Sequence, residues 1–144
     1  MNVSGTGLGT VLKVKVVQEK NAQRELAAIA QKREAEEKHL DQLSQTQDSA
    51  LSQASEVTRS KAGDLQTSRA FIQSINRQVV QQGEKVDTAK SHETAKRDEL
   101  VERSKSRQMV ESLDTKRREA WVKEDERKAQ RVIDVLAQRM KIGL

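Results

Sequence analysis

Proline, cysteine and tyrosine are absent from this chain of 144 residues, and its large aromatic side chains are limited to Phe71 and Trp121. Without cysteine the chain forms no disulfide and no thiolate metal site, which fits a reducing compartment. A compact core of this size usually contains several aromatic residues, because these bury the most area per residue. The chain is therefore expected to bury a narrow seam between helices and not a large core.

Glycine is also scarce inside the chain, where it occurs at Gly63 and Gly83 and otherwise near the two ends. Tight turns draw on glycine and proline for their backbone angles. Gly63 lies near the middle and is followed by Asp64, a residue that can cap a helix, so the pair predicts one hairpin turn. Gly83 costs a helix about 1 kcal/mol relative to alanine, and we expect it to mark a close approach or a local bend.

What the chain does contain is 34% charged and 34% apolar residues, most of them good helix formers. This composition is typical of coiled coils, and the regular apolar spacing argues against disorder. It predicts an all-α fold of two long helices that form an antiparallel coiled-coil hairpin. The expected segments are a flexible leader at 1–7, a first helix at 8–60, a turn at 61–67 and a second helix at 68–141.

A leaky heptad repeat runs along both predicted helices. With Leu8 at position d and Leu12 at position a, small apolar clusters alternate with polar breaks, as in a helix that packs against one partner. Beyond Leu100 the apolar pattern shifts towards Met109, Leu113 and Trp121. When the chain is folded about the predicted turn, the residues expected in the seam are Leu12, Leu26, Ile29, Leu40, Leu43, Val79, Val86, Leu100 and Leu113.

The two arms of this hairpin are unequal, because the turn lies before the middle of the chain. The segment 121–141 is therefore expected to project beyond the first helix, and residues 121–144 would span up to ~36 Å at 1.5 Å per residue. Val132, Leu136 and Met140 share one stripe on this segment, with Ile133 beside it. An uncovered apolar stripe usually marks a partner surface. The alternatives are a homodimer contact and fraying of the chain end.

Positive charge is concentrated in the same part of the chain. From residue 103 onward there are 12 Lys or Arg and 7 Asp or Glu, whereas residues 1–102 carry 15 of each. A basic helix favours an acidic partner, either a protein or a nucleic acid. The alternative is a solvated helix face whose charges pair along the helix.

No catalytic or ligand-binding pattern is found. His39 and His92 would not lie level in the hairpin and have no thiol nearby. The glycine-rich run at 5–10 lacks the Lys-Ser/Thr of a phosphate-binding loop. We therefore expect no enzymatic activity, no cofactor, no metal and no small-molecule ligand.

The chain has no signal for export or for membrane insertion. Its apolar runs stay far below the roughly 20 residues of a membrane span, and its first residues lack the basic and apolar regions of a signal peptide. A cytoplasmic protein is expected.

Three local patterns resemble the FliJ family of flagellar export stalk proteins. They are the reversal Ala62-Gly63-Asp64-Leu65 with the cluster Phe71-Ile72 and Ile75 after it, the basic-then-aromatic stretch from Leu113 to Trp121 with acidic residues following, and the ending Ile133-Asp134 to Arg139. The resemblance covers about residues 8–140. Stalk proteins of the YscO type from injectisomes share the same architecture.

The resemblance implies a non-enzymatic, chaperone-like export component, attached peripherally to the inner membrane. Such a stalk enters a hexameric export ATPase, as the γ subunit enters a rotary ATPase, and couples it to the cytoplasmic domain of the export gate. The implied ATPase surface consists of Trp121, Arg127, Arg131, Val132, Leu136 and Met140. The implied gate surface, which could instead contact export chaperones, consists of Phe71, Ile72 and Ile75.

Two other classes of function fit the same residues. A nucleic-acid-associated coiled coil would use the basic helix, although seven acidic residues are interleaved there and Trp121 is the one aromatic available for stacking. A self-associating structural coiled coil would use the apolar stripe. An injectisome stalk is the alternative within the export systems.

Overall fold

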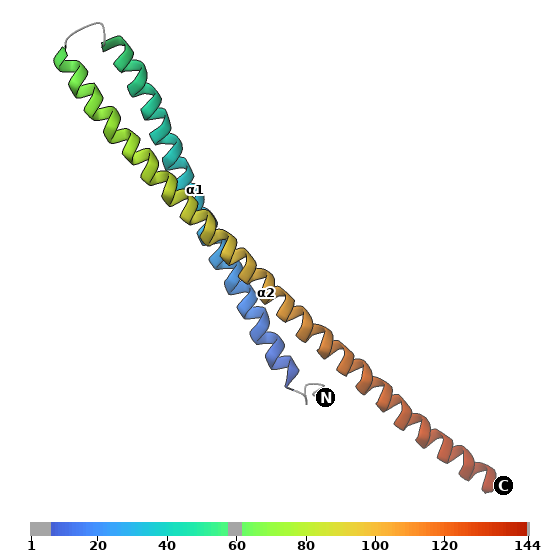
Figure 1. The fold of residues 1–144 in the computed structure, drawn as a ribbon. Helices are drawn as coiled ribbons and strands as arrows, with labels where there is room; N and C mark the ends of the chain where they lie inside the picture. The colour runs from blue at the N-terminus through green and yellow to red at the C-terminus, as the bar shows by residue number, and fades with distance from the viewer. Residues whose placement is uncertain (1–6, 58–61, 144) are drawn as a thin grey trace. The chain divides into compact units, whose positions relative to one another are not determined.

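The computed structural model describes residues 7–57 and 62–143, which form two α-helices. Helix α1 spans Leu8–Val57 and helix α2 spans Ala62–Ile142. The described residues contain no strand, and the two helices run antiparallel (Figure 1). The prediction of an all-α antiparallel hairpin is confirmed. Neither described helix is long and apolar enough to cross a membrane.

The hairpin connection is placed differently from the prediction. Because α2 begins at Ala62, Gly63 and Asp64 lie in its first turn and not in a turn at 61–67. A carboxylate in the first turn of a helix interacts favourably with the helix dipole, so Asp64 fits this place. The connection itself, like residues 1–6 of the predicted leader, lies outside the described residues.

One glycine precedes the first residue of α1, and another follows the last residue of α2. Gly7 precedes α1 with φ at 68°, a conformation that glycine adopts without strain, and its carbonyl accepts a hydrogen bond from the Val11 amide at 3.2 Å. After the last residue of α2, the amide of Gly143 donates a hydrogen bond to the carbonyl of Arg139 at 2.9 Å.

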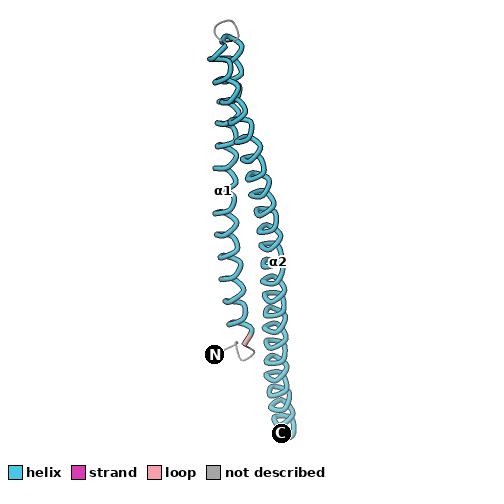
Figure 2. Tube along the Cα trace, turned by 60° about the vertical axis from the view of Figure 1, so that its left-hand side comes forward, coloured by secondary structure: helices cyan, strands magenta, loops and turns pink. Residues whose placement is uncertain are grey.

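The contacts divide the chain into two compact units, which are described separately. The turn unit comprises residues 21–100, and the terminal unit comprises residues 1–20 together with 101–144. Within the turn unit, α1 and α2 lie side by side in two views (Figures 1 and 2). Within the terminal unit, the pairing of the helices is marked by an ion pair between Glu19 of α1 and Arg107 of α2.

The seam of the turn unit is narrow. Its buried apolar residues are Ala22, Ala50, Ile75, Val86 and Ala89, which are 4–7% exposed. Three of these five are alanines, so the seam buries little apolar area. The predicted seam residues Leu26, Ile29, Leu40, Leu43, Val79 and Leu100 are half-buried, as is Leu12 in the terminal unit.

Polar side chains occupy several of the remaining seam positions. Gln82 and Glu93 are 3% and 8% exposed, at positions d and a of α2. Gln82 donates a hydrogen bond to the backbone carbonyl of Glu36 at 3.0 Å, and Arg33 pairs with Glu93. A buried charge is costly unless it is paired, so these contacts between the helices are what makes a polar seam possible.

The predicted shift of register beyond Leu100 is wrong. The heptad continues through residues 103, 107, 110 and 114, which are half-buried or buried, whereas Met109 and Leu113 are 73% and 44% exposed. Leu113 therefore lies outside the seam. The reason is that charged residues hold most of these seam positions, where Arg107 and Asp114 form ion pairs with Glu19 and Arg118, so Val110 alone of the four is apolar and marks the register.

Gly83 does not mark a close approach. It lies inside α2, which continues across it, and a Cβ atom added to it would meet no heavy atom within 4 Å. The predicted close approach is therefore wrong.

Candidate functional site

The candidate site is the end of α2 that no other part of the described chain covers. Every residue from Thr115 to Gly143 is exposed. The last seam position with a buried residue is Asp114. Because the helices are antiparallel, α2 extends beyond Leu8, the first residue of α1. The projecting segment at 121–141 falls entirely within this exposed helix.

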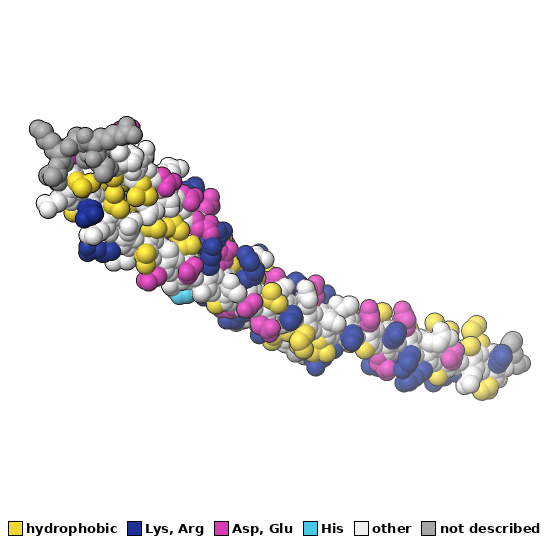
Figure 3. Space-filling model, turned by 45° about the horizontal axis from the view of Figure 1, so that its top comes forward, with side chains coloured by type: hydrophobic (Ala, Val, Ile, Leu, Met, Phe, Trp, Pro, Cys, Tyr) yellow, Lys and Arg dark blue, Asp and Glu magenta, His cyan; other side chains and the backbone are white. Residues whose placement is uncertain are grey.

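An apolar stripe lies open along the projecting segment. Val132, Leu136 and Met140 are 59%, 52% and 74% exposed, and Ile133 is 58% exposed. Their spacing of four residues keeps the first three on one side of the helix. Figure 3 shows hydrophobic side chains interspersed with Lys and Arg at this end of the molecule. A helix that leaves such a stripe in solvent has apolar area available for a partner.

The polar groups of the same segment are held only by neighbours along the helix. Arg127 lies 3.9 Å from the carboxylate of Glu124, and Gln130 donates to Asp134 at 3.0 Å. Arg131 is exposed, and Trp121 is 46% exposed. Exposed ion pairs of this kind contribute little to stability, so the charges can be rearranged around a partner at low cost.

The second predicted surface, near the hairpin connection, is only partly accessible. Phe71 is 50% exposed, Ile72 is half-buried, and Ile75 is 5% exposed. Ile75 therefore packs in the seam of the turn unit and is not offered to a partner in this conformation. Phe71 is the residue of the three that a partner could reach.

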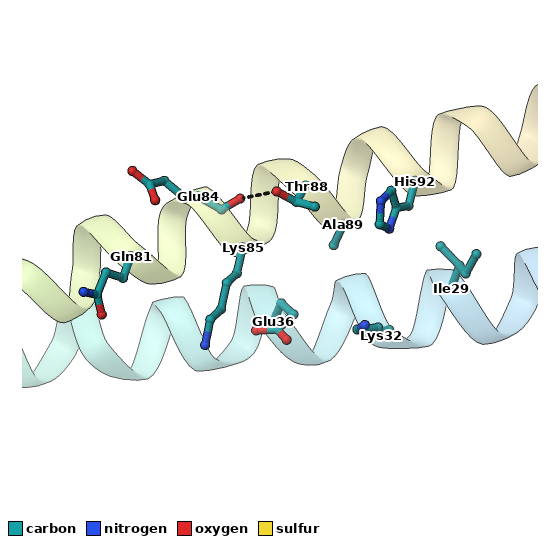
Figure 4. Close-up of a pocket in the computed structure, with 9 residues that line it drawn as sticks. All are labelled: Ile29, Lys32, Glu36, Gln81, Glu84, Lys85, Thr88, Ala89 and His92. Carbon is teal, nitrogen blue, oxygen red and sulfur yellow. Dashed lines mark hydrogen bonds between the residues drawn. The ribbon is translucent and has the colours of Figure 1, made fainter.

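A groove between the helices of the turn unit has a volume of about 790 Å³. Figure 4 shows Lys85 reaching across towards α1 beside Glu36, with Ala89 pointing from α2 towards α1 and Ile29 pointing from α1 towards α2 further along the groove. His92 borders the groove, but no cluster of metal-binding side chains occurs among the described residues. Its lysines and glutamates are balanced, so the groove selects no charge class of ligand.

Two cations of the turn unit have raised pKa values. The carboxylates of Glu25 and then Glu99 accept hydrogen bonds from Lys96, both at 3.1 Å, and raise its pKa. Desolvation lowers the pKa of Arg33, but the hydrogen bonds and charges of Glu93 and Glu37 outweigh it, so the pKa is raised overall. Both cations therefore join the helices and are not proton donors near neutral pH.

The buried polar residues Gln82, Glu93 and Asp114 were missed by sequence reasoning. A signal was present, because all three fall on the a or d positions of a strict heptad counted from Ile72 or Ile75. Counting apolar residues alone passes over them.

Comparison with known proteins adds one match. The family model described as "Flagellar FliJ protein" matches residues 5–143, nearly the whole chain. No curated protein and no solved structure matches. The match extends over both helices and includes the exposed end of α2. This chain therefore belongs to the FliJ family of flagellar proteins.

Proposed function

We propose that this chain is a stalk of the flagellar type III export apparatus, in which residues 121–141 of α2 are held by a hexameric export ATPase. The observation that carries the proposal is the exposure of α2 from Thr115 onward, with an apolar stripe that nothing in the described chain covers. Burial of such a stripe by another protein is the main favourable term available to it.

The distribution of apolar residues around the segment favours a partner that encloses the helix. Val135, Val132, Leu136 and Ile133 are all at least 50% exposed. At 3.6 residues per turn, they spread over about half of the circumference, which is wider than the stripe that one partner helix would cover. A ring of subunits around the helix would contact all of them, as in the γ-subunit-like arrangement.

The charge of the segment specifies the lining of such a ring. The net charge of +5 arises after residue 102, and Arg127 and Arg131 are both exposed within the projecting segment. Acidic loops in the ring would complement them, and this attraction would weaken with added salt.

In the turn unit, we propose that Phe71 contacts the cytoplasmic domain of the export gate or an export chaperone. It is half exposed and lies in the first turns of α2, whereas Ile75 supports the helix from within the seam. The protein would then connect the ATPase to the gate at the cytoplasmic face of the inner membrane, peripherally attached.

The ATPase contact is tested with the double variant Val132→Asp/Leu136→Asp. It should bind the purified export ATPase at least tenfold more weakly and lose any stimulation of ATP hydrolysis, because charges replace the centre of the stripe. The matched control is Leu51→Asp/Val80→Asp, which introduces the same two aspartates at side chains 50% and 63% exposed in the turn unit. Equal binding by the double variant and the control would contradict the proposal.

The charge contribution is tested separately. Arg127→Glu/Arg131→Glu should reduce ATPase binding more strongly than Arg69→Glu/Arg77→Glu, which reverses two exposed arginines of the turn unit. Equal losses would mean that net charge alone, and not this segment, attracts the ATPase.

The gate contact needs its own variant. Phe71→Ala should reduce binding to the isolated cytoplasmic domain of the gate, or to chaperones, while leaving ATPase binding intact. Loss of ATPase binding instead would contradict the assignment of the two contacts to separate units of the chain.

Self-association is the competing use of the apolar stripe. Sedimentation analysis of the purified chain distinguishes the two, because a monomer leaves the stripe free for the ATPase. A stable dimer that Val132→Asp/Leu136→Asp converts to a monomer would support a self-associating coiled coil.

A further inference from the structure

The heptad positions show which side chains share one side of the hairpin. In the turn unit, Lys96 lies 3.1 Å from the carboxylates of both Glu25 and Glu99, which occupy position g of their helices. Lys90 lies 3.7 Å from Glu37, and both occupy position e. Position g of the two helices therefore faces one side, and position e faces the other.

The same positions carry apolar residues in the terminal unit. Glu19 and Arg107, both at heptad position a, form an ion pair there. One heptad further along, residue 12 therefore lies level with residue 114. Next to residues 12 and 114, heptad position g is occupied by Val11 and Leu113, which are 42% and 44% exposed. One helical turn away, at position c, lie Val14 and Met109, which are 50% and 73% exposed.

We call this set the g-side patch: Val11, Val14, Met109 and Leu113. On α2 it coincides with a shallow groove of about 630 Å³ whose lining includes Met109 and Leu113, with Lys105 and Lys116 also bordering it. The patch draws on both helices, so it differs from the stripe of the projecting segment, which belongs to α2 alone. Apolar side chains gathered from two helices on one side favour a binding surface over scattered exposure.

An unsatisfied polar atom lies at the next position g of α1. The Oε1 of Gln18 is buried and has no hydrogen-bond partner among the described residues. A buried acceptor without a donor is unfavourable, so a partner that drew the Gln18 amide outward and supplied a donor would stabilise the complex.

The charge around the g-side patch indicates which charge its ligand should carry. Residues 8–20 and 101–116 carry seven Lys or Arg and four Asp or Glu. All four carboxylates are already in ion pairs: Glu19 and Glu111 with Arg107, Glu102 with Lys105, and Asp114 with Arg118. The surplus is positive, and negative charge on a partner would complement it.

From these observations we propose that the g-side patch binds an amphipathic α-helix of a partner protein, with acidic residues flanking its apolar stripe. Two packed helices offer a third helix the side formed by their g and c positions, and apolar side chains three or four residues apart on that helix can fill it. The result is a local bundle of three helices. This surface does not depend on the proposed ATPase contact.

Two designed peptides test the proposal directly. Both are amphipathic helices of about 20 residues with the same leucine stripe, and one is flanked by Glu whereas the other is flanked by Lys. Fluorescence anisotropy with the full chain should show binding of the Glu peptide at least tenfold tighter than that of the Lys peptide, weakening as salt is added. Equal affinities, or no binding of the Glu peptide, would overturn the proposal.

Substitutions locate the surface. Val14→Asp/Met109→Asp should weaken binding of the Glu peptide at least tenfold, whereas Val80→Asp and Val132→Asp/Leu136→Asp should bind as the unmodified chain does. All these positions are exposed, so circular dichroism should show unchanged helicity. Unchanged binding by Val14→Asp/Met109→Asp would refute the g-side patch and leave the ATPase proposal untouched.

Discussion

Gln82 of α2 donates a hydrogen bond from its Nε2 to the backbone carbonyl of Glu36 of α1 at 3.0 Å, and it also contacts the Glu36 carboxylate. Both residues occupy position d, where a coiled coil usually has leucine. At 3% exposure, Gln82 is more deeply buried than the buried apolar residues of the seam, which are 4–7% exposed. The two helices are thus joined at this level by an amide and not by apolar packing.

Replacing this amide should be costly. Gln82→Ala removes the donor and leaves Glu36 without its partner, and we expect the free energy of unfolding to fall by about 1–3 kcal/mol. Denaturant unfolding followed by circular dichroism measures the change. The adjacent Gln81 is exposed, so Gln81→Ala is a matched control that should stay within about 0.5 kcal/mol. Similar losses in both variants would mean that the hydrogen bond contributes nothing.

Gly83, the next residue, should respond in the opposite direction. Because an added Cβ would meet nothing within 4 Å, Gly83→Ala gains helix propensity without a clash. We expect the free energy of unfolding to rise by about 0.5–1 kcal/mol, visible as a higher midpoint in thermal unfolding. A lower midpoint would indicate that another molecule or helix approaches Gly83 closely in solution.

The contribution of Lys96 should depend on pH in a defined window. Its pKa is raised above the ordinary value of 10.5 by Glu25 and then Glu99, so folding favours the charged form. The stabilisation is therefore complete below pH 10.5 and is lost as the pH rises through the raised pKa. Melting temperatures of the unmodified chain and of Lys96→Met should differ at neutral pH and converge above that range. A constant difference across the range would exclude the ion pairs as its cause.

Much of the fold could be predicted because it depends on what the chain lacks. With no proline and few interior glycines, the sequence predicts long helices and a single reversal of the chain. Because α2 is longer than α1, the end of α2 is then left uncovered. The position of the connection could not be read in the same way. Gly63 is tolerated in the first turn of a helix, so its presence does not require a turn at that residue.

The path of the seam beyond Leu100 was harder to predict for a different reason. The apolar residues there lead to Met109 and Leu113, whereas the seam continues in steps of seven residues because ion pairs satisfy the polar residues that occupy it. The path of the seam also decides which residues a partner can reach, because an apolar residue that lies outside the seam is exposed. Leu113 is such a case, since it lies in the g-side patch.

The paired charges Arg33 and Glu93 should fix the register of the hairpin. If α2 slipped by one heptad in either direction, Arg33 would face Val86 or Leu100, and Glu93 would face Leu26 or Leu40. Both slips leave a charge in the seam without a partner, which is strongly unfavourable. The observed register is the one in which the guanidinium meets the carboxylate.

A charge exchange tests this role. Arg33→Glu and Glu93→Arg should each lower the melting temperature, because each places two like charges together at position a. The double variant should recover most of the loss, since the pair is restored with its ends exchanged. Cysteines introduced at Gln47 and Asn76, whose side chains share a hydrogen bond at 2.6 Å between the helices, report the register through the rate of disulfide formation. That rate should fall in the single variants and return in the double variant. If it stayed constant in all of them, apolar packing alone would set the register.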